Sequence, residues 1–260
     1  MAHVELAGGS IDYEASGDGE PVVLLHARPF VRWYEPLASI LDGWRVVQYR
    51  RPVPTDTELT IDGDAVLAAA LLRHLGIERP HVVGHSYGGL VALALARQVT
   101  VRSVALLEPA TAGLVEPAVA AARFGGLLQL AGEAGAEAAM RAFLTAVCGP
   151  GAEDALDRAV PGATAETLAH ADGFFAAELP AVIAFDLAAT GVADITAPVL
   201  NVTGTSSGPR FAEAASIIGS WFPAATRREV PGANHLLIAQ HPAAVGALLE
   251  SWWRSLPIAP

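Results

Sequence analysis

The chain has 260 residues, of which 52% are hydrophobic and 17% are charged, and its formal net charge is −11. Its length suits one large α/β core, and its apolar content excludes a largely disordered chain. The acidic balance disfavours nucleic-acid partners, which bind basic patches, and every apolar stretch is broken before the roughly 20 residues of a membrane span.

The first 110 residues alternate short apolar runs with helical patterns, which is typical of a largely parallel sheet flanked by helices. The first two runs predict an antiparallel hairpin, and the next runs predict strands that are buried on both faces. The predicted strands are residues 4–6, 11–15, 22–26, 44–49, 81–84 and 101–107. The helices predicted between them are 60–75, with Thr60 as N-cap and Gly76 as stop, and 90–97.

The strand pattern fades between residues 111 and 196, where Ala, Gly, Leu and Glu recur at helical spacing. We interpret this segment as a helical lid inserted after the sixth strand of a core that comprises residues 1–110 and 197–260. The core then resumes with two strands, each followed by a helix, at residues 198–203, 211–218, 227–230 and 242–256. The sequence thus predicts an α/β fold with eight strands.

Residues 84–89 read Gly-His-Ser-Tyr-Gly-Gly and match the G-x-S-x-G nucleophile elbow. In this elbow, a sharp turn from a strand to a helix holds the serine in a strained conformation, and small neighbours prevent clashes. The apolar runs on both sides of the motif supply the strand and the helix. Ser86 is therefore the candidate nucleophile. The alternative is a tight turn in which Ser86 only caps a helix.

Three segments of the chain resemble the α/β-hydrolase superfamily, and the likeness covers nearly the whole sequence. Residues 23–27 (Val-Leu-Leu-His-Ala) are similar to the family's apolar strand ending in His-Gly, residues 84–89 to its elbow, and residues 230–235 (Val-Pro-Gly-Ala-Asn-His) to its Gly-x-x-His. The resemblance implies an α/β-hydrolase fold with a mostly parallel eight-stranded sheet and a helical lid. It also implies that His235 takes the proton of the serine.

The sequence departs from the family at the acid that orients the histidine. The family commonly places this acid in a Gly-x-x-Asp pattern after the seventh strand, but residues 204–207 read Gly-Thr-Ser-Ser, so Ser207 stands at the acid position. Glu108 follows the sixth strand at the sheet edge where ligands bind, as the acid does in haloalkane dehalogenases and some lipases. We therefore expect Glu108 to orient His235. The alternative is a solvated glutamate at a strand end.

The resemblance also predicts an oxyanion hole. Its donors would be the N–H of Tyr87 and an N–H of the loop at Ala27 and Arg28, with Arg28 the first choice. Ala27 stands where the family frequently has glycine. The Arg28 side chain is expected either to pair with a substrate carboxylate at the pocket mouth or to point into solvent. We expect His26 to brace this loop and His85 to point away from the pocket.

Two further features bear on the pocket. Residues 48–54 (Gln-Tyr-Arg-Arg-Pro-Val-Pro) replace a segment that often reads Asp-Arg-Arg-Gly-x-Gly in relatives, which predicts an altered pocket floor. Four aromatic residues are expected either to line an apolar pocket or to belong to the core: Trp33, Tyr34, Phe174 and Phe175.

The function that these features favour is hydrolysis of an ester, lactone, thioester or related acyl bond of a small, apolar metabolite, without a metal or cofactor. Two alternatives stay open at this point: a non-hydrolytic enzyme on the same scaffold, performing C–C cleavage, elimination, cyclisation or cofactor-free oxygenation, and a non-catalytic ligand-binding protein. We expect no nucleic-acid or membrane partner and a monomer or homodimer. The single cysteine, Cys148, and the absence of a signal-peptide pattern favour the cytoplasm.

Overall fold

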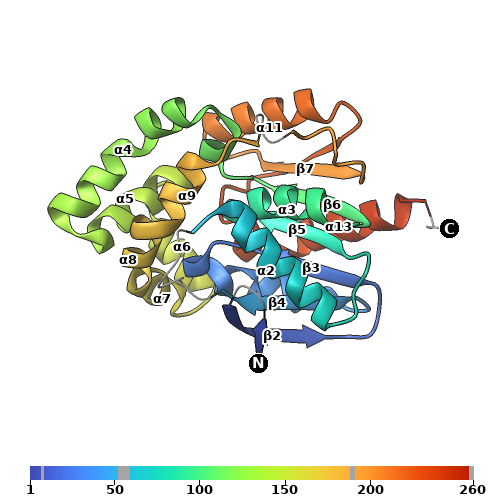
Figure 1. Cartoon of the computed structure of the whole chain (residues 1–260). Helices are drawn as coiled ribbons and strands as arrows, with labels where there is room; N and C mark the ends of the chain where they lie inside the picture. The colour runs from blue at the N-terminus through green and yellow to red at the C-terminus, as the bar shows by residue number, and fades with distance from the viewer. Residues whose placement is uncertain (7–8, 52–58, 188–190, 258–260) are drawn as a thin grey trace.

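The fold was analysed in a computed structural model, which describes residues 1–6, 9–51, 59–187 and 191–257. Its centre is an eight-stranded sheet with the strand order β1-β2-β4-β3-β5-β6-β7-β8 (Figure 1). The strands are β1 (Ala2–Leu6), β2 (Gly9–Ser16), β3 (Pro21–Leu25), β4 (Arg45–Arg50), β5 (His81–His85), β6 (Ser103–Leu107), β7 (Val199–Gly204) and β8 (Thr226–Val230). The predicted fold class and all eight predicted strands are confirmed.

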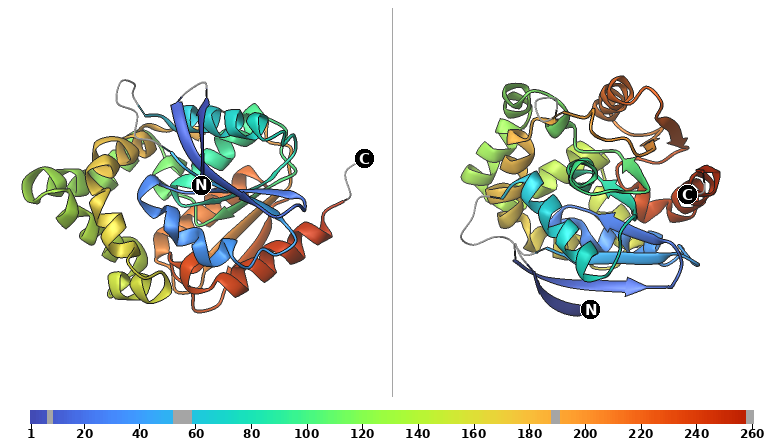
Figure 2. Two further views of the ribbon diagram at one scale, coloured as in Figure 1. Left: turned by 90° about the horizontal axis from the view of Figure 1, so that it is seen from below. Right: turned by 45° about the vertical axis from the view of Figure 1, so that its right-hand side comes forward.

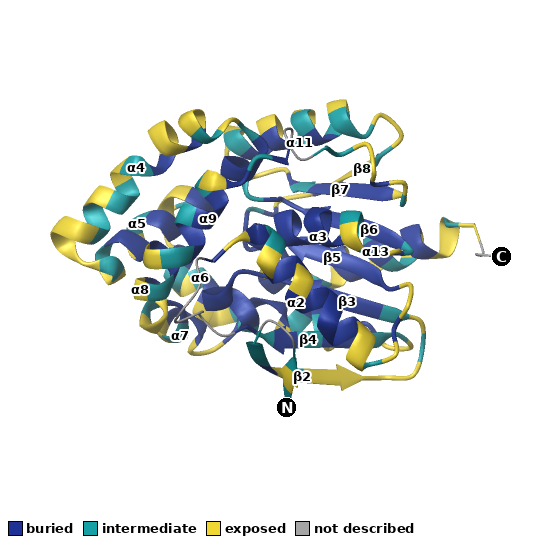
Figure 3. Ribbon diagram, in the orientation of Figure 1, coloured by how far each residue is buried: buried dark blue, intermediate teal, exposed yellow. Residues whose placement is uncertain are grey.

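The direction of the strands follows from the hydrophobic pattern. β1 and β2 form the expected antiparallel hairpin, in which Val4 lies opposite Ile11, and β2 also runs antiparallel to β4. All later pairs are parallel. Every residue of β5 and β6 is buried, as the apolar residues at the centre of these strands require of a sheet covered on both faces. By contrast, much of β2, the strand next to the edge strand β1, is exposed (Figure 3).

Helices cover both faces of the sheet (Figure 2). α2 and α3 pack against each other on one face, and α1 packs against α13 on the other. The helical segments of the core are η1 (Arg28–Tyr34), α1 (Glu35–Ala38), α2 (Ile61–His74), α3 (Tyr87–Gln98), α11 (Pro209–Trp221), α12 (Leu237–Gln240) and α13 (Pro242–Ser255). The four helices predicted for the core are confirmed, whereas η1, α1 and α12 are additions that the sequence patterns did not reveal.

The start and end of α2 illustrate how local chemistry sets a boundary. The Thr60 hydroxyl accepts a hydrogen bond from the N–H of Gly63 at 3.0 Å, which is the predicted N-cap. The helix ends at His74, and Gly76 follows with a φ of +65°, a conformation that glycine adopts without strain. This cap places Asp64 in the first turn of α2, where it meets the loop after β3.

The described part of the segment between β6 and β7 consists of helices joined by loops and contains no strand, as predicted, and it extends from one end of the sheet (Figure 1). Its elements are η2 (Thr111–Leu114), α4 (Pro117–Ala134), α5 (Ala136–Cys148), α6 (Ala152–Ala159), α7 (Ala163–Ala169), α8 (Ala171–Gly173), the π-helical turn η3 (Phe174–Glu178) and α9 (Leu179–Ala184). In the 18 residues of α4, only Ala120 and Phe124 are buried. We call residues 111–196 the helical region. Its role as a lid stays a prediction.

Candidate active site

Ser86 occupies the sharp turn between β5 and α3. Its backbone angles are φ 53° and ψ −119°, a conformation that is costly for a residue with a side chain. A Cβ atom on Gly88 would lie 1.9 Å from the carbonyl oxygen of Leu25, and one on Gly84 would lie 2.3 Å from that of Gly88. The two glycines are therefore required by the close approach of backbone segments, and the turn has the geometry that the elbow motif predicts.

Glu108 occupies a second strained position directly after β6, with a φ of 47°. Among the non-glycine residues that the structure describes, only Ser86 and Glu108 have a positive φ. The two turns are joined by backbone hydrogen bonds, from the N–H of Ser86 to Leu107 at 3.2 Å and from the N–H of Ala110 to Ser86 at 2.9 Å. Strain of this kind persists only where its surroundings enforce it, and it concentrates at functional sites.

His235 lies between β8 and α12, and its imidazole contacts the Glu108 carboxylate. Nδ1 of His235 donates to Oε2 of Glu108 at 2.8 Å, and both side chains are almost completely buried. Because Nδ1 carries the proton of this bond, Nε2 of the neutral ring is left with a lone pair. His235 and Ser86 line the same pocket. The arrangement can move a proton from a hydroxyl to an imidazole whose charged form a carboxylate stabilises.

Ser207, which stands where relatives have the acid, contacts Glu108 instead. Its hydroxyl donates to Oε1 of Glu108, and the N–H of Gly204 donates to the same oxygen at 2.7 Å. With His235 on the other oxygen, both carboxylate oxygens have hydrogen-bond partners. Glu108 is fully buried, so the alternative of a solvated glutamate is wrong. Ser207 is a site residue whose contact with Glu108 the sequence did not reveal, although the departure from the Gly-x-x-Asp pattern marked its position.

His85 lies behind the pocket, as expected, and is not among the lining residues. Its ring packs against that of His235 with 4.5 Å between centroids, and its Nε2 donates to the His235 carbonyl oxygen at 3.0 Å. Burial, together with His235, holds the pKa of His85 well below its usual value. The side chain is thus a neutral support for the backbone and ring of His235.

The pocket in front of Ser86 is narrow, with a cavity volume of about 40 Å³, and is mainly apolar. Its phenylalanine side chains come from η1, from the helical region and from α11: Phe30, Phe124, Phe143, Phe174 and Phe211. Of the four aromatic residues considered from the sequence, only Phe174 lines this pocket, whereas Trp33, Tyr34 and Phe175 belong to the core. The altered segment at 48–54 lies mostly outside the described residues, which end at Arg51 and resume at Leu59.

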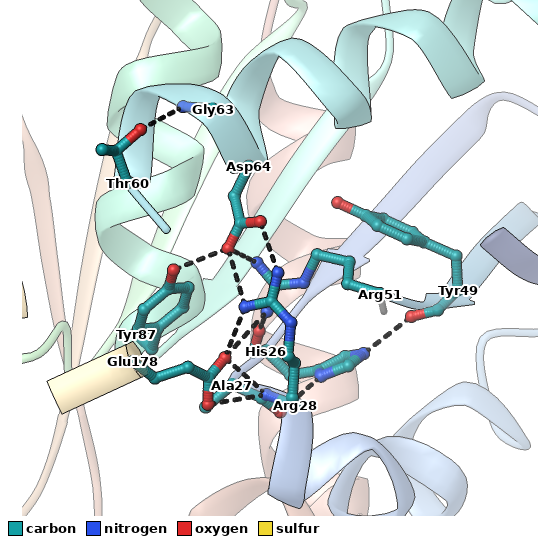
Figure 4. Close-up of polar contacts among 10 residues, drawn as sticks. All are labelled: His26, Ala27, Arg28, Tyr49, Arg51, Thr60, Gly63, Asp64, Tyr87 and Glu178. Atoms are coloured by element: carbon teal, nitrogen blue, oxygen red, sulfur yellow. Dashed lines mark hydrogen bonds and ion pairs between the residues drawn. The ribbon is translucent and has the colours of Figure 1, made fainter. Parts of the chain in front are cut away.

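The structure contradicts both expectations for the Arg28 side chain and shows the backbone N–H of Arg28 engaged by another residue. Its N–H, the expected first choice for the oxyanion hole, donates to the two oxygens of the Glu178 carboxylate at 2.9 and 3.2 Å (Figure 4). Its guanidinium is buried and donates to Asp64 at 2.7 and 3.2 Å and to Glu178 at 2.9 Å, so it neither points into solvent nor offers its charge to a substrate. The sequence could not reveal this, because Asp64 and Glu178 lie 36 and 150 residues away.

Arg28 belongs to a buried ionic cluster, which we define as Arg28, Arg51, Asp64 and Glu178 (Figure 4). Arg51 donates to Asp64 at 2.7 Å and also to the carbonyl oxygen of His26. Burial raises the pKa of Asp64, but Arg51 and Arg28 outweigh this and lower it overall. For Glu178, burial prevails over the arginines and raises the pKa. The cluster ties the helical region to the loop after β3 and to α2.

Tyr87 and Ala27 both line the pocket. The Tyr87 hydroxyl donates to Asp64 at 2.6 Å, so its side chain is held away from Ser86 while its N–H remains at the start of α3. Ala27 has φ −75° and ψ 151°, angles that any residue adopts, which explains why alanine can replace glycine here. The oxyanion role of these two N–H groups stays a prediction.

His26 braces the loop, as expected. Its Nδ1 lies 2.6 Å from the carbonyl oxygen of Ala27 and its Nε2 lies 3.0 Å from that of Tyr49. Burial and the charge of Arg51 lower the pKa of His26 to about 3, so the ring is neutral at physiological pH.

Two further kinds of site are absent from the part of the chain that the structure describes. No group of three or more His, Cys, Asp or Glu side chains is placed to hold a metal ion there. In the same residues, no helix combines the length and the apolar character that crossing a bilayer requires.

Comparison with known proteins identifies relatives of this architecture. The sequence model of the "Alpha/beta hydrolase family" matches residues 22–248. A curated relative, 2-hydroxy-6-oxo-6-phenylhexa-2,4-dienoate hydrolase of Comamonas testosteroni, is 30% identical over 108 residues, which span 37% of this chain and only 38% of the relative.

Solved structures match over almost the whole chain. A carboxylesterase of the thaumarchaeon Nitrososphaera gargenis has a TM-score of 0.78 at 19% identity, covering 97% of this chain and 98% of that one. A thermophilic esterase of Thermogutta terrifontis has a TM-score of 0.77 at 21% identity, with 98% of both chains covered. The enol-lactonase of Burkholderia xenovorans LB400 has a TM-score of 0.76 at 21% identity, covering 98% of this chain and 100% of that one. At such identities, these matches show a shared fold.

Proposed function

The chain belongs to the alpha/beta hydrolase family, and from this membership we propose that it hydrolyses an ester, lactone or related acyl compound through Ser86, His235 and Glu108. The observation that carries the proposal is the 2.8 Å hydrogen bond from His235 to the buried Glu108 carboxylate, beside a pocket that Ser86 and His235 both line. The strained backbone at Ser86 and Glu108 supports it. The names of the esterase and lactonase neighbours agree with this bond class.

In the proposed reaction, Oγ of Ser86 attacks the substrate carbonyl carbon while Nε2 of His235 takes the hydroxyl proton. The Glu108 carboxylate stabilises the imidazolium that forms. When the tetrahedral intermediate collapses, the proton passes from His235 to the leaving alcohol and an acyl-Ser86 ester remains. Water then attacks this ester, again with His235 as base, and releases the acid. No metal or cofactor is required for these steps.

The oxyanion of the intermediate needs N–H donors, and the N–H of Tyr87 is the first donor in this proposal. The N–H of Arg28 donates to Glu178, so a second donor at Arg28 would require the Glu178 carboxylate to give way to the oxyanion. We also propose that the helical region acts as a lid, since Phe143, Phe174 and Leu179 of that region form part of the pocket wall.

The apolar lining indicates a substrate with an apolar body. Five phenylalanine side chains line the pocket, in keeping with small-molecule sites, which are lined mainly by hydrophobic and aromatic side chains. The name of the Comamonas testosteroni relative describes a phenyl-bearing carboxylate as that protein's substrate, which is compatible with an aromatic-lined pocket.

The test is labelling with an active-site-directed fluorophosphonate followed by mass spectrometry of the intact protein. Wild type should gain the mass of one phosphonyl group, and Ser86→Ala should gain none, because only a serine activated by a base reacts. The same pair of proteins is then assayed on a panel of aryl esters and lactones. An unlabelled wild-type protein that hydrolyses no member of the panel would contradict the proposed function.

A further inference from the structure

Arg210 brings a positive charge to the mainly apolar pocket. It lies in the first turn of α11 and lines the pocket beside Phe211. Its guanidinium carbon is 6.0 Å from the centroid of the Phe124 ring on α4, which is within the range of a cation–π contact. The side chain therefore lies between α11 and α4 at the pocket wall.

The carboxylate that could neutralise Arg210 is engaged elsewhere. Glu213 follows three residues later on the same helix, a spacing at which ion pairs form. Its two oxygens instead accept hydrogen bonds from Arg123 of α4 at 2.7 and 2.9 Å. Within the part of the chain that the structure describes, no hydrogen bond or ion pair joins Arg210 to another residue.

The contrast with Arg28 shows what this means for ligand binding. The Arg28 guanidinium is satisfied by two buried carboxylates, whereas Arg210 keeps its hydrogen-bond donors beside the pocket. A guanidinium presents these donors as a planar fork that matches the two oxygens of a carboxylate. Apolar walls strengthen such a pair, because they screen charge less than water does.

We propose that Arg210 binds an anionic group of the substrate, a carboxylate that is separate from the scissile acyl bond. The substrate class is then an ester or lactone with an apolar, aromatic body and a free carboxylate, in which the body lies among the phenylalanine side chains. Arg210 takes the role that the sequence suggested for Arg28. This inference rests on the proposed function for the bond that is cleaved, but the binding of the anion can be measured without turnover.

The first experiment measures binding to the Ser86→Ala protein by titration calorimetry, with 4-phenylbutyrate and the neutral 4-phenylbutanol as probes. We expect the acid to bind about tenfold or more tightly than the alcohol, as for a hydrogen bond to a charged group. Adding Arg210→Gln should remove this preference. Adding Arg158→Gln, which removes the same charge from the exposed face of α6, should preserve it. Equal affinity of the two probes, or no binding of the acid, would overturn the inference.

The second experiment compares hydrolysis of two p-nitrophenyl esters of equal acyl length, the anionic mono-ester of glutarate and the neutral pentanoate. Arg210→Gln should raise KM for the anionic ester about tenfold relative to any change for the neutral one, and Arg158→Gln should alter neither. If wild type hydrolyses the neutral ester and Arg210→Gln leaves the ratio unchanged, only the inference about Arg210 fails. If wild type hydrolyses neither ester nor any member of the panel and is not labelled by the fluorophosphonate, the proposed function fails, and the calorimetry still decides the role of Arg210.

Discussion

Glu108 and Glu178 are both fully buried carboxylates near the pocket, but their partners differ in kind. Glu178 accepts from the N–H and the guanidinium of Arg28 and lies 3.9 Å from Arg51. Glu108 accepts from the Gly204 N–H, from the Ser207 hydroxyl and from the His235 imidazole. The first carboxylate is neutralised by permanent cations. The second meets a full positive charge only when His235 takes up a proton.

This difference separates a structural carboxylate from one that is suited to catalysis. A charge that is permanently paired holds segments of chain together, but its pairing provides no additional stabilisation when a proton moves nearby. A carboxylate that is hydrogen-bonded to an imidazole stabilises the imidazolium that forms during proton transfer. We therefore expect changes at Glu108 to affect turnover and changes in the ionic cluster to affect folding.

The largest effect is expected for Glu108→Gln. The amide keeps the shape of the side chain but cannot stabilise a charged His235, so kcat should fall by about 10³–10⁴-fold while the thermal unfolding temperature stays close to that of wild type. The measurement is steady-state hydrolysis of whichever ester in the panel wild type cleaves, with unfolding followed by circular dichroism.

Ser207→Ala is the matched control for this prediction, because it removes one donor from Glu108 and leaves the carboxylate in place. A loss of about tenfold is expected, as for one hydrogen bond to a charged group. If Glu108→Gln retained more than a tenth of wild-type kcat, Glu108 would not be a carboxylate that acts in turnover, and the distinction drawn between it and Glu178 would be wrong.

A large effect on stability is expected for Asp64→Ala. The change leaves Arg28 and Arg51 buried with one carboxylate instead of two and deprives the Tyr87 hydroxyl of its acceptor. The free energy of unfolding should fall by about 3–5 kcal/mol, which urea denaturation can measure. Glu137→Ala, which breaks an exposed pair with Arg141, should cost less than about 1 kcal/mol. Similar values for the two variants would show that the ionic cluster contributes no more than a surface pair.

A smaller effect is expected on the pH dependence of stability. The pKa of His26 is about 3 in the folded protein and 6.5 when unfolded, so between these values the unfolded chain binds more protons. The stabilisation is present in full above pH 6.5 and is lost as the pH falls towards 3, with a slope of about 1.4 kcal/mol per pH unit.

His26→Gln removes this titration and keeps an N–H donor for the Tyr49 carbonyl oxygen. Between pH 6 and pH 4, it should lose about 2 kcal/mol less stability than wild type, as judged by urea denaturation at each pH. His85, which is also buried and neutral, accounts for part of the remaining slope in both proteins. Parallel curves for wild type and His26→Gln would contradict the low pKa of His26.

Local patterns were sufficient to predict most of the fold. The buried strands contain short apolar runs, α2 has its cap at Thr60, and the elbow at Ser86 is flanked by the strand and the helix that it needs. These features depend on residues close together in sequence, so their physical causes can be read along the chain. The short segments η1, α1 and α12 escaped prediction, because each has too few residues for a periodic pattern.

The sequence by itself determined the fold class, the turn that holds Ser86 and the candidacy of His235 and Glu108. Only the tertiary structure decided what these and neighbouring side chains contact. It joins Glu108 to Ser207, which is 99 residues away, and it buries Arg28 against Asp64 and Glu178 instead of placing it at the pocket mouth. An ion pair or a hydrogen bond depends on distances of a few ångströms between atoms, and for residues far apart in sequence the packing of the whole chain sets those distances. For the same reason, the sequence did not reveal that Arg210 lines the pocket.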